Sequence, residues 1–181
     1  MTATITFRDA VPGDEARIVW FIRALADYET LLHEVAATEA DMALALFGPT
    51  PRCHSMFVDV DGVTVGFGLW YYNFSTFAGR HGLYVEDVFV LPEHRGKGVG
   101  RAIFSELARR AIAEGCKRME WSVLNWNAPA VNFYRVLGAI PMDEWTTQRL
   151  AGDALAAVAA NTPRPLTPAQ GAPTWLTSPS T

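Results

Sequence analysis

A glycine-rich turn, Arg95-Gly96-Lys97-Gly98-Val99-Gly100, separates a β-rich run at residues 83–91 from a run with helical periodicity that begins near residue 103. Successive backbone N–H groups of such a turn can converge on phosphate oxygens, and the following helix N-terminus adds a favourable dipole. The turn is not a Walker A loop because no Gly-Lys-Ser/Thr follows, and its G-x-G-x-G spacing differs from the dinucleotide fingerprint. A phosphate site is therefore expected, and the alternative is a flexible turn with solvated charges.

Apolar periodicity divides the rest of the chain into short strands and helices. Strands are expected at residues 5–8, 53–60, 64–72, 83–91, 119–124 and 145–150. Helices are expected at residues 14–28, 38–46, 103–114 and 127–137 and near residue 155. Asp14, Thr38 and Asn127 stand where they can cap the first, second and fourth of these helices. Intermixed strands and helices predict an α/β (α+β) fold with one mixed, mostly antiparallel central sheet flanked by helices.

Composition limits the class of protein. Half of the 181 residues are hydrophobic and 19% are charged, so the chain can bury a core. The net charge of −4 argues against nucleic-acid binding, and no export signal or membrane span is expected. One domain is expected over residues 1–160, followed by a proline-rich, flexible tail at 161–181. The two cysteines suit a reducing, cytoplasmic setting, and the four histidines form no spaced metal or triad set.

Several motifs together resemble the GNAT family of N-acetyltransferases. Arg95-x-x-Gly98-x-Gly100 resembles the family's acetyl-CoA pyrophosphate loop, and Asn127…Asn132-Phe133-Tyr134…Leu137-Gly138-Ala139 resembles its second cofactor segment. Over residues 5–159 the chain resembles the diamine (spermidine/spermine) N-acetyltransferase branch. The pieces that carry this second resemblance are Ala26-Asp27-Tyr28-Glu29, Tyr84-Val85-Glu86-Asp87-Val88-Phe89-Val90 and Asn125-Trp126-Asn127.

The resemblance implies a GNAT fold and transfer of an acetyl group from acetyl-CoA to a primary amine. Glu86 matches the family's general base, which acts through water, and Tyr134 matches its general acid. The matched cofactor-binding residues are Val88, Phe89, Val90, Arg95, Gly96, Lys97, Gly98, Val99, Gly100, Arg101, Asn127 and Tyr134. The matched substrate-binding residues are Tyr28, Glu29, Glu86, Asp87 and Glu144. The resemblance further implies a homodimer and a polyamine, diamine or lysine-like acceptor.

The residues themselves leave alternatives to several of these roles. Glu86 lies mid-strand among apolar residues, so partial burial is expected, and the alternative is an ion pair at the sheet edge. Asp87 points to the opposite face unless a bulge intervenes. An oxyanion donor near Val88 also requires such a bulge. Tyr134 could be an ordinary core residue. The Trp70-Tyr71-Tyr72 run is interpreted as core packing combined with a subunit contact.

The acceptor is the least constrained part of the prediction. Trp145 could form one wall for an amine by a cation–π contact, but the spacing from Gly138 to Trp145 is shorter than the branch pattern, which weakens the match of Glu144. A drug amine or a protein amine is an alternative acceptor for the same fold. A non-catalytic acyl-CoA-binding sensor is the alternative from another functional class.

Overall fold

A computed structural model describes residues 3–161, which divide into two units between Ala139 and Ile140. The first unit contains a five-stranded sheet with strand order β1-β2-β3-β4-β5. Its strands are β1 (Ile5–Asp9), β2 (His54–Val60), β3 (Val63–Ser75), β4 (Arg80–Val90) and β5 (Met119–Trp121). Strands β1 to β4 pair antiparallel and β5 pairs parallel to β4, which confirms the predicted mixed, mostly antiparallel sheet.

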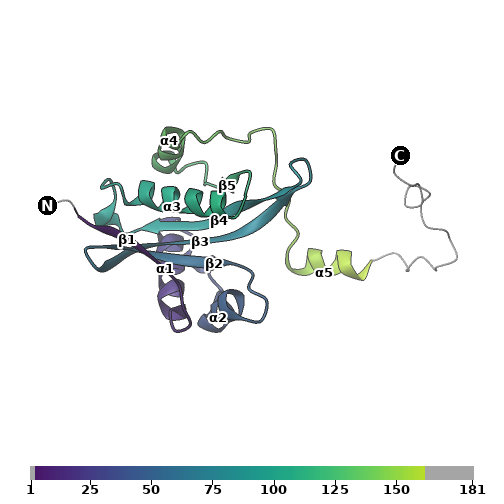
Figure 1. Cartoon of the computed structure of the whole chain (residues 1–181). Coiled ribbons are helices and arrows are strands. Elements are labelled where there is room, and N and C mark those ends of the chain that lie inside the picture. Colours follow the sequence, from purple (N-terminus) through teal and green to yellow (C-terminus); the bar gives the residue numbers. More distant parts are fainter. Residues whose placement is uncertain (1–2, 162–181) are drawn as a thin grey trace. The chain divides into compact units, whose positions relative to one another are not determined.

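Helices cover both faces of this sheet (Figure 1). On one face lie α1 (Glu15–Tyr28) and α2 (Glu39–Phe47), and on the other lie α3 (Val99–Ala113) and α4 (Ala128–Leu137). Short 3₁₀ turns, η1 (Leu32–Glu34) and η2 (Pro92–His94), follow α1 and β4. Two apolar clusters fill the layers: Ile103 and Leu107 of α3 pack on the sheet in one, and Ile18 and Phe21 of α1 in the other.

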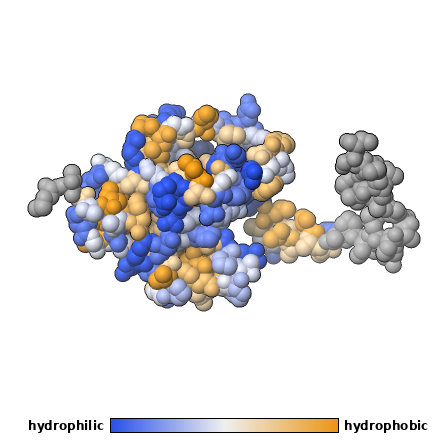
Figure 2. All heavy atoms as spheres, viewed as in Figure 1, coloured by the Kyte–Doolittle hydropathy of each residue, from blue (hydrophilic) through white to orange (hydrophobic). Residues whose placement is uncertain are grey.

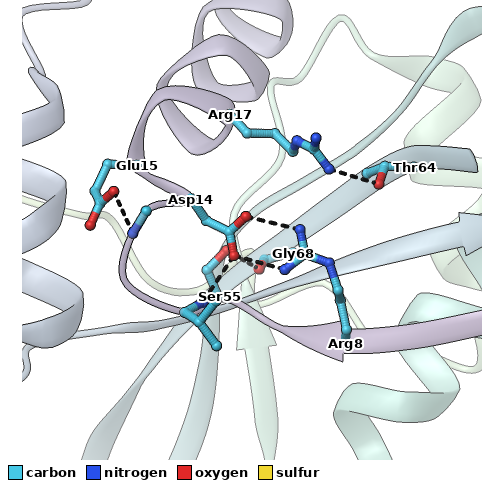
Figure 3. A network of polar contacts seen from close by, with 9 residues as sticks. Arg8, Asp14, Glu15, Arg17, Ser55, Thr64 and Gly68 are labelled. Atoms are coloured by element: carbon cyan, nitrogen blue, oxygen red, sulfur yellow. Dashed lines mark hydrogen bonds and ion pairs between the residues drawn. The ribbon is translucent and has the colours of Figure 1, made fainter.

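The start of α1 is fixed to β1 by charged groups rather than by a side-chain cap. The carboxylate of Asp14 accepts hydrogen bonds from Arg8 Nη1 and Nη2 at 2.7 and 2.9 Å and from the Val11 N–H at 3.0 Å (Figure 3). The predicted capping by the Asp14 side chain is therefore wrong, because Arg8 and the preceding turn hold its oxygens. The bond to Arg8 lowers the pKa of Asp14. These contacts anchor the helix whose far end carries Tyr28.

Two other predicted caps are confirmed. Thr38 and Asp41 form a reciprocal capping box at α2. Asn127 accepts a hydrogen bond from the Ala130 N–H at the start of α4, where it satisfies one otherwise unpaired helical amide. Each cap starts its helix at a residue that the sequence had indicated.

A β-bulge interrupts the pairing of β3 with β4. Leu69 pairs with Asp87, while the next residue, Trp70, pairs with Val85, so Glu86 is the extra residue on β4. The bulge lies next to the place where β5 ends, because the last β4–β5 pair is Val85 with Trp121. From residue 86 to residue 90, β4 continues alone on that side.

The second unit differs from what the sequence predicts. A strand was expected at residues 145–150, but the described part of this unit contains only one regular element, α5 (Gly152–Ala160). A strand needs a neighbour to pair with, and the described residues of this unit offer none. The helix expected near residue 155 is confirmed as α5, which displays apolar side chains such as Leu155 and Val158 (Figure 2).

The remaining predictions about domains lie partly outside the described residues. The predicted tail falls at residues 162–181 apart from Asn161, so its flexibility stays a prediction, as does the domain boundary at residue 160. Between residues 3 and 161, no helix has the length and apolar character needed to span a bilayer.

Candidate active site

A cleft of about 830 Å³ opens in the first unit where β4 and β5 separate. Its walls come from the end of α1, the second half of β4, the glycine-rich turn with the start of α3, the end of β5 with the loop that follows, and α4. These segments are far apart in the sequence. They meet around the space that opens where the parallel strands β4 and β5 separate.

The glycine-rich turn forms one end of the cleft. Gly96 and Gly98 have φ angles of 71° and 86°, and Gly98 directly precedes α3. These left-handed values strain any residue with a Cβ. No atom lies within 4 Å of the position that a Cβ would take at either glycine, so the space above the turn is open. Open amides at a helix N-terminus suit the phosphates of a coenzyme A molecule.

The unpaired edge of β4 forms the floor of the cleft. Residues 87–90 pair with β3 on one side only, and no strand within residues 3–161 pairs with the other side. Backbone N–H and C=O groups on such an edge are available to an extended ligand. The edge runs from the acidic end of the cleft toward the glycine-rich turn, and its geometry therefore suits the amide-bearing pantetheine arm of coenzyme A.

Arg95 folds back from the turn across this floor. Its guanidinium carbon lies 4.4 Å from the centroid of the Tyr28 ring and 5.1 Å from that of Phe89. Its Nε donates a 2.9 Å hydrogen bond to the carbonyl oxygen of Val90. Tyr28 in turn donates from its hydroxyl to Oδ1 of the buried Asn127 at 3.3 Å. A chain of contacts thus links the turn, the end of α1 and the cap of α4.

Three carboxyl groups gather at the other end of the cleft. Glu29, at the end of α1, and Asp87 are half-buried, while Glu86 is exposed. Burial, then the charges of Glu86 and Glu29, raises the pKa of Asp87 to about 6. Burial alone raises the pKa of Glu29. The predicted partial burial of Glu86 is wrong, because its side chain, on the bulge residue, is exposed. Of the two neighbouring acids on β4, Asp87 is the half-buried one.

Tyr134 of α4 lies in the aromatic wall of the cleft. Its ring centroid is 5.1 Å from that of Trp121 and 5.4 Å from that of Phe104. Burial, followed by the charges of Glu29 and Tyr28, raises its pKa to about 12. With this pKa the phenol is protonated at neutral pH. Its hydroxyl makes no hydrogen bond within the described residues and is therefore free to donate.

The cleft contains most of the residues that the sequence singled out. The predicted site residues that line it are Tyr28, Glu29, Glu86, Asp87, Val88, Phe89, Val90, Arg95, Gly96, Gly98, Gly100, Arg101, Asn127 and Tyr134. Three others do not line it. Lys97 is exposed within the turn, Val99 is buried in the core, and Glu144 belongs to the second unit.

Sequence reasoning missed the apolar and hydroxyl part of the wall. Phe104, Trp121 and Ser122 line the cleft without having been singled out. A signal for Trp121 existed, because it is a large aromatic residue within the strand predicted at residues 119–124, which in the structure already ends at Trp121. Ser122 is the residue directly after Trp121, where β5 ends.

Comparison with known proteins gives a consistent result. Residues 21–139 match the Acetyltransferase (GNAT) family. The chain is 35% identical over 164 residues to thialysine N-epsilon-acetyltransferase of Mus musculus, which covers 84% of this chain and 96% of that protein. It is 30% identical to spermidine/spermine N(1)-acetyltransferase-like protein 1 of Homo sapiens over 75% of this chain and 20% of that protein. The fold resembles an integron cassette protein from the mobile metagenome of V. cholerae, with a TM-score of 0.71, 25% identity, and 88% and 98% of the two chains covered.

Proposed function

Because this chain belongs to the GNAT family of acetyltransferases, we propose that it moves an acetyl group from acetyl-CoA to a primary amine of a small cationic acceptor, a polyamine, a diamine or a lysine-like amino acid. The predicted family and branch are confirmed by the matches. The names of the relatives support a small amine as the acceptor, and the acidic end of the cleft suits a cation.

One observation carries the proposal: a single open strand edge connects a phosphate-suited turn with a group of acids and a protonated tyrosine. Coenzyme A carries phosphates at one end and the reacting thioester at the other. Gly98 lines the end of the cleft that suits the phosphates. Asp87 and Tyr134 line the end where the thioester would lie. The cofactor would therefore span the cleft with its acetyl group beside the residues that can move protons.

Proton transfer into the protein must come first, because an ammonium group has no lone pair with which to attack. Asp87 has the burial and the raised pKa that suit a proton acceptor near neutral pH. We therefore place the base at Asp87, acting directly or through one water. Glu86, the residue matched to the family base, is kept as the competing assignment because it lines the same end of the cleft.

The remaining steps concern the thioester, which acetyl-CoA supplies. The amine nitrogen bonds to the acetyl carbon while the carbon–sulfur bond breaks. A backbone amide near Val88, beyond the bulge and on the edge of β4 that β5 does not cover, would stabilise the negative charge that develops on the carbonyl oxygen. Tyr134 donates its hydroxyl proton to the leaving sulfur, and coenzyme A departs as the thiol. The new amide nitrogen passes its surplus proton to the Tyr134 phenolate, and the base returns the first ammonium proton to solvent. Atoms and charges thus balance across the two groups.

The proposal is tested by thiol release from acetyl-CoA in the presence of a panel of acceptors. The panel contains spermidine, putrescine, thialysine, lysine, a peptide and an aminoglycoside. Saturable release with the polyamines, diamines or lysine-like amino acids is the expected result. Release only with the peptide or the aminoglycoside would move the acceptor to the protein-amine or drug-amine class. Tight acetyl-CoA binding without release from any acceptor would favour a sensor.

We propose three further expectations. By resemblance to the branch, the chain forms a homodimer and Glu144 contacts the acceptor. Its cysteine usage suits a cytoplasmic location, and Trp145 could contact the acceptor through a cation–π interaction. Trp145 is exposed in the second unit, as expected of a residue available to a ligand or a second copy. Sedimentation of the purified chain would test the dimer.

A further inference from the structure

Two tyrosine rings stand side by side next to the acidic end of the cleft. Tyr71 of β3 and Tyr84 of β4 are register partners, and their ring centroids are 5.1 Å apart at an interplanar angle of 31°. Their strand neighbours Trp70 and Val85 pack in the core beneath α3. Because side chains alternate along a strand, both tyrosines lie on the opposite face of the sheet, where each is half-buried.

The pair borders the cleft through Ser122 and Glu86, although neither ring lines it. The hydroxyls of Tyr84 and Ser122 are hydrogen-bonded at 2.7 Å, and Ser122 lines the cleft. Glu86 lies two residues beyond Tyr84 on β4 and also lines it. Burial, and then the charge of Glu86, raises the pKa of Tyr71, which shows that this carboxylate lies within electrostatic reach of the pair.

Two carboxylates, Glu86 and Glu120, lie near the tyrosine pair, and Glu86 is the one that has no partner among the described residues. Glu120 also raises the pKa of Tyr71, but its carboxylate is paired with Arg118 at 2.7 Å and accepts a 2.9 Å hydrogen bond from Asn73. Glu86 makes no ion pair or hydrogen bond among the described residues. Two aromatic faces beside an unpaired carboxylate are the surroundings that stabilise an ammonium group, through cation–π attraction and charge.

We propose that Tyr71, Tyr84 and Glu86 form a subsite for a second ammonium group of the acceptor, so that the enzyme selects extended diamines and polyamines over monoamines. The inference rests on the proposed function, since it assumes that the reacting amine lies at Asp87. Tyr84 and Asp87 are three residues apart on β4 with the bulge at Glu86 between them, so their separation is below the ~10 Å that a regular strand would give. An acceptor whose two charges are separated by a comparable length reaches both places.

The test compares two acceptors that differ only in the second amine, diaminooctane and octylamine, with spermidine as a third. For each enzyme variant, the ratio of kcat/KM for the diamine to kcat/KM for the monoamine is measured. Tyr71→Leu and Tyr84→Leu are expected to lower this ratio about 3- to 30-fold, mainly through KM of the diamine, as removal of a cation–π contact requires. Tyr84→Phe keeps the ring and should keep the ratio.

Tyr72→Leu is the matched control, because Tyr72 neighbours Tyr71 but lies on the other face, against His54 and His81. Its ratio should equal that of the wild type. Equal ratios in the control and in both leucine variants would overturn the subsite, as would a loss confined to kcat. If the wild type acetylates none of the three acceptors, the proposed function itself fails, which is a separate outcome.

Discussion

The two ends of the cleft are built from different kinds of group. The cofactor end consists of backbone: glycine amides at the start of α3 and the unpaired edge of β4. The acceptor end consists of side chains, with acids and tyrosines brought from three separate elements, α1, β4 and α4. The backbone end is therefore sensitive to conformation and the side-chain end to charge and protonation. Substitutions at the two ends should damage different steps of one reaction.

Replacement of the proposed acid should have the largest effect on turnover. Tyr134→Phe removes only the hydroxyl and leaves the ring packed against Trp121 and Phe104. We expect kcat to fall by about 10²–10³-fold, the scale of general acid catalysis, while the Kd of acetyl-CoA stays close to that of the wild type. Stopped-time thiol assays and calorimetry measure the two quantities. Unchanged turnover would remove Tyr134 from the mechanism.

The complementary change breaks the backbone end. Gly98→Val forces a branched residue into a left-handed conformation and fills the open space above the turn. Strain of this kind costs about 1–3 kcal/mol, so we expect the Kd of acetyl-CoA to rise by about 10- to 100-fold.

Gly115→Val is the matched control for that change. Gly115 has a similar φ of 76° and equally open surroundings, but it follows α3 and does not line the cleft. This variant should lose stability and still bind acetyl-CoA as the wild type does. Equal Kd values for the two variants would show that strain, and not the site, explains the loss.

The pH dependence sharpens the comparison at the acceptor end. Because the pKa of Asp87 is about 6 and the base must be ionised, kcat/KM should fall about tenfold per pH unit below that value. Asp87→Asn should lower kcat/KM by about 10²-fold or more and abolish this acidic limb, whereas Glu86→Gln should keep it. The reverse pattern would assign the base to Glu86.

The same carboxyl predicts a smaller effect on stability, with a definite sign. The pKa of Asp87 is raised from 3.8 to about 6, so the folded state holds the proton more tightly than the unfolded state does. The wild type therefore loses stability as the pH rises from about 4 through 6, by up to about 3 kcal/mol. Asp87→Asn should be more stable than the wild type in urea at pH 7, with the advantage vanishing near pH 4. Equal stability at both pH values would contradict the assignment.

The sequence predicts the backbone end better than the side-chain end, for a physical reason. The turn from Arg95 to Gly100 and the cap at Asn127 depend on residues close together in the chain, so local patterns identify them. The exchange of burial between Glu86 and Asp87 depends on a bulge, which is set by the register between β3 and β4. No pattern within β4 alone contains that information.

The errors elsewhere have similar causes. The helix expected at residues 103–114 is confirmed, although α3 begins at Val99. Its periodicity does not tell which residues of the turn face the cleft, and Val99 is buried in the core. The segment at residues 145–150 contains β-prone residues such as Trp145, Thr146 and Thr147, but the described part of its unit holds no strand to pair with. Both cases need contacts between distant segments, which a single sequence does not display.

The most direct test of the central claim measures acetyl-CoA affinity and acceptor-dependent kcat side by side in the wild type, Gly98→Val and Tyr134→Phe. The account predicts that the wild type acetylates a small cationic amine, that Gly98→Val loses affinity, and that Tyr134→Phe loses turnover while it keeps affinity. A wild type that binds acetyl-CoA without acetylating any amine, or two variants that lose both properties together, would contradict it.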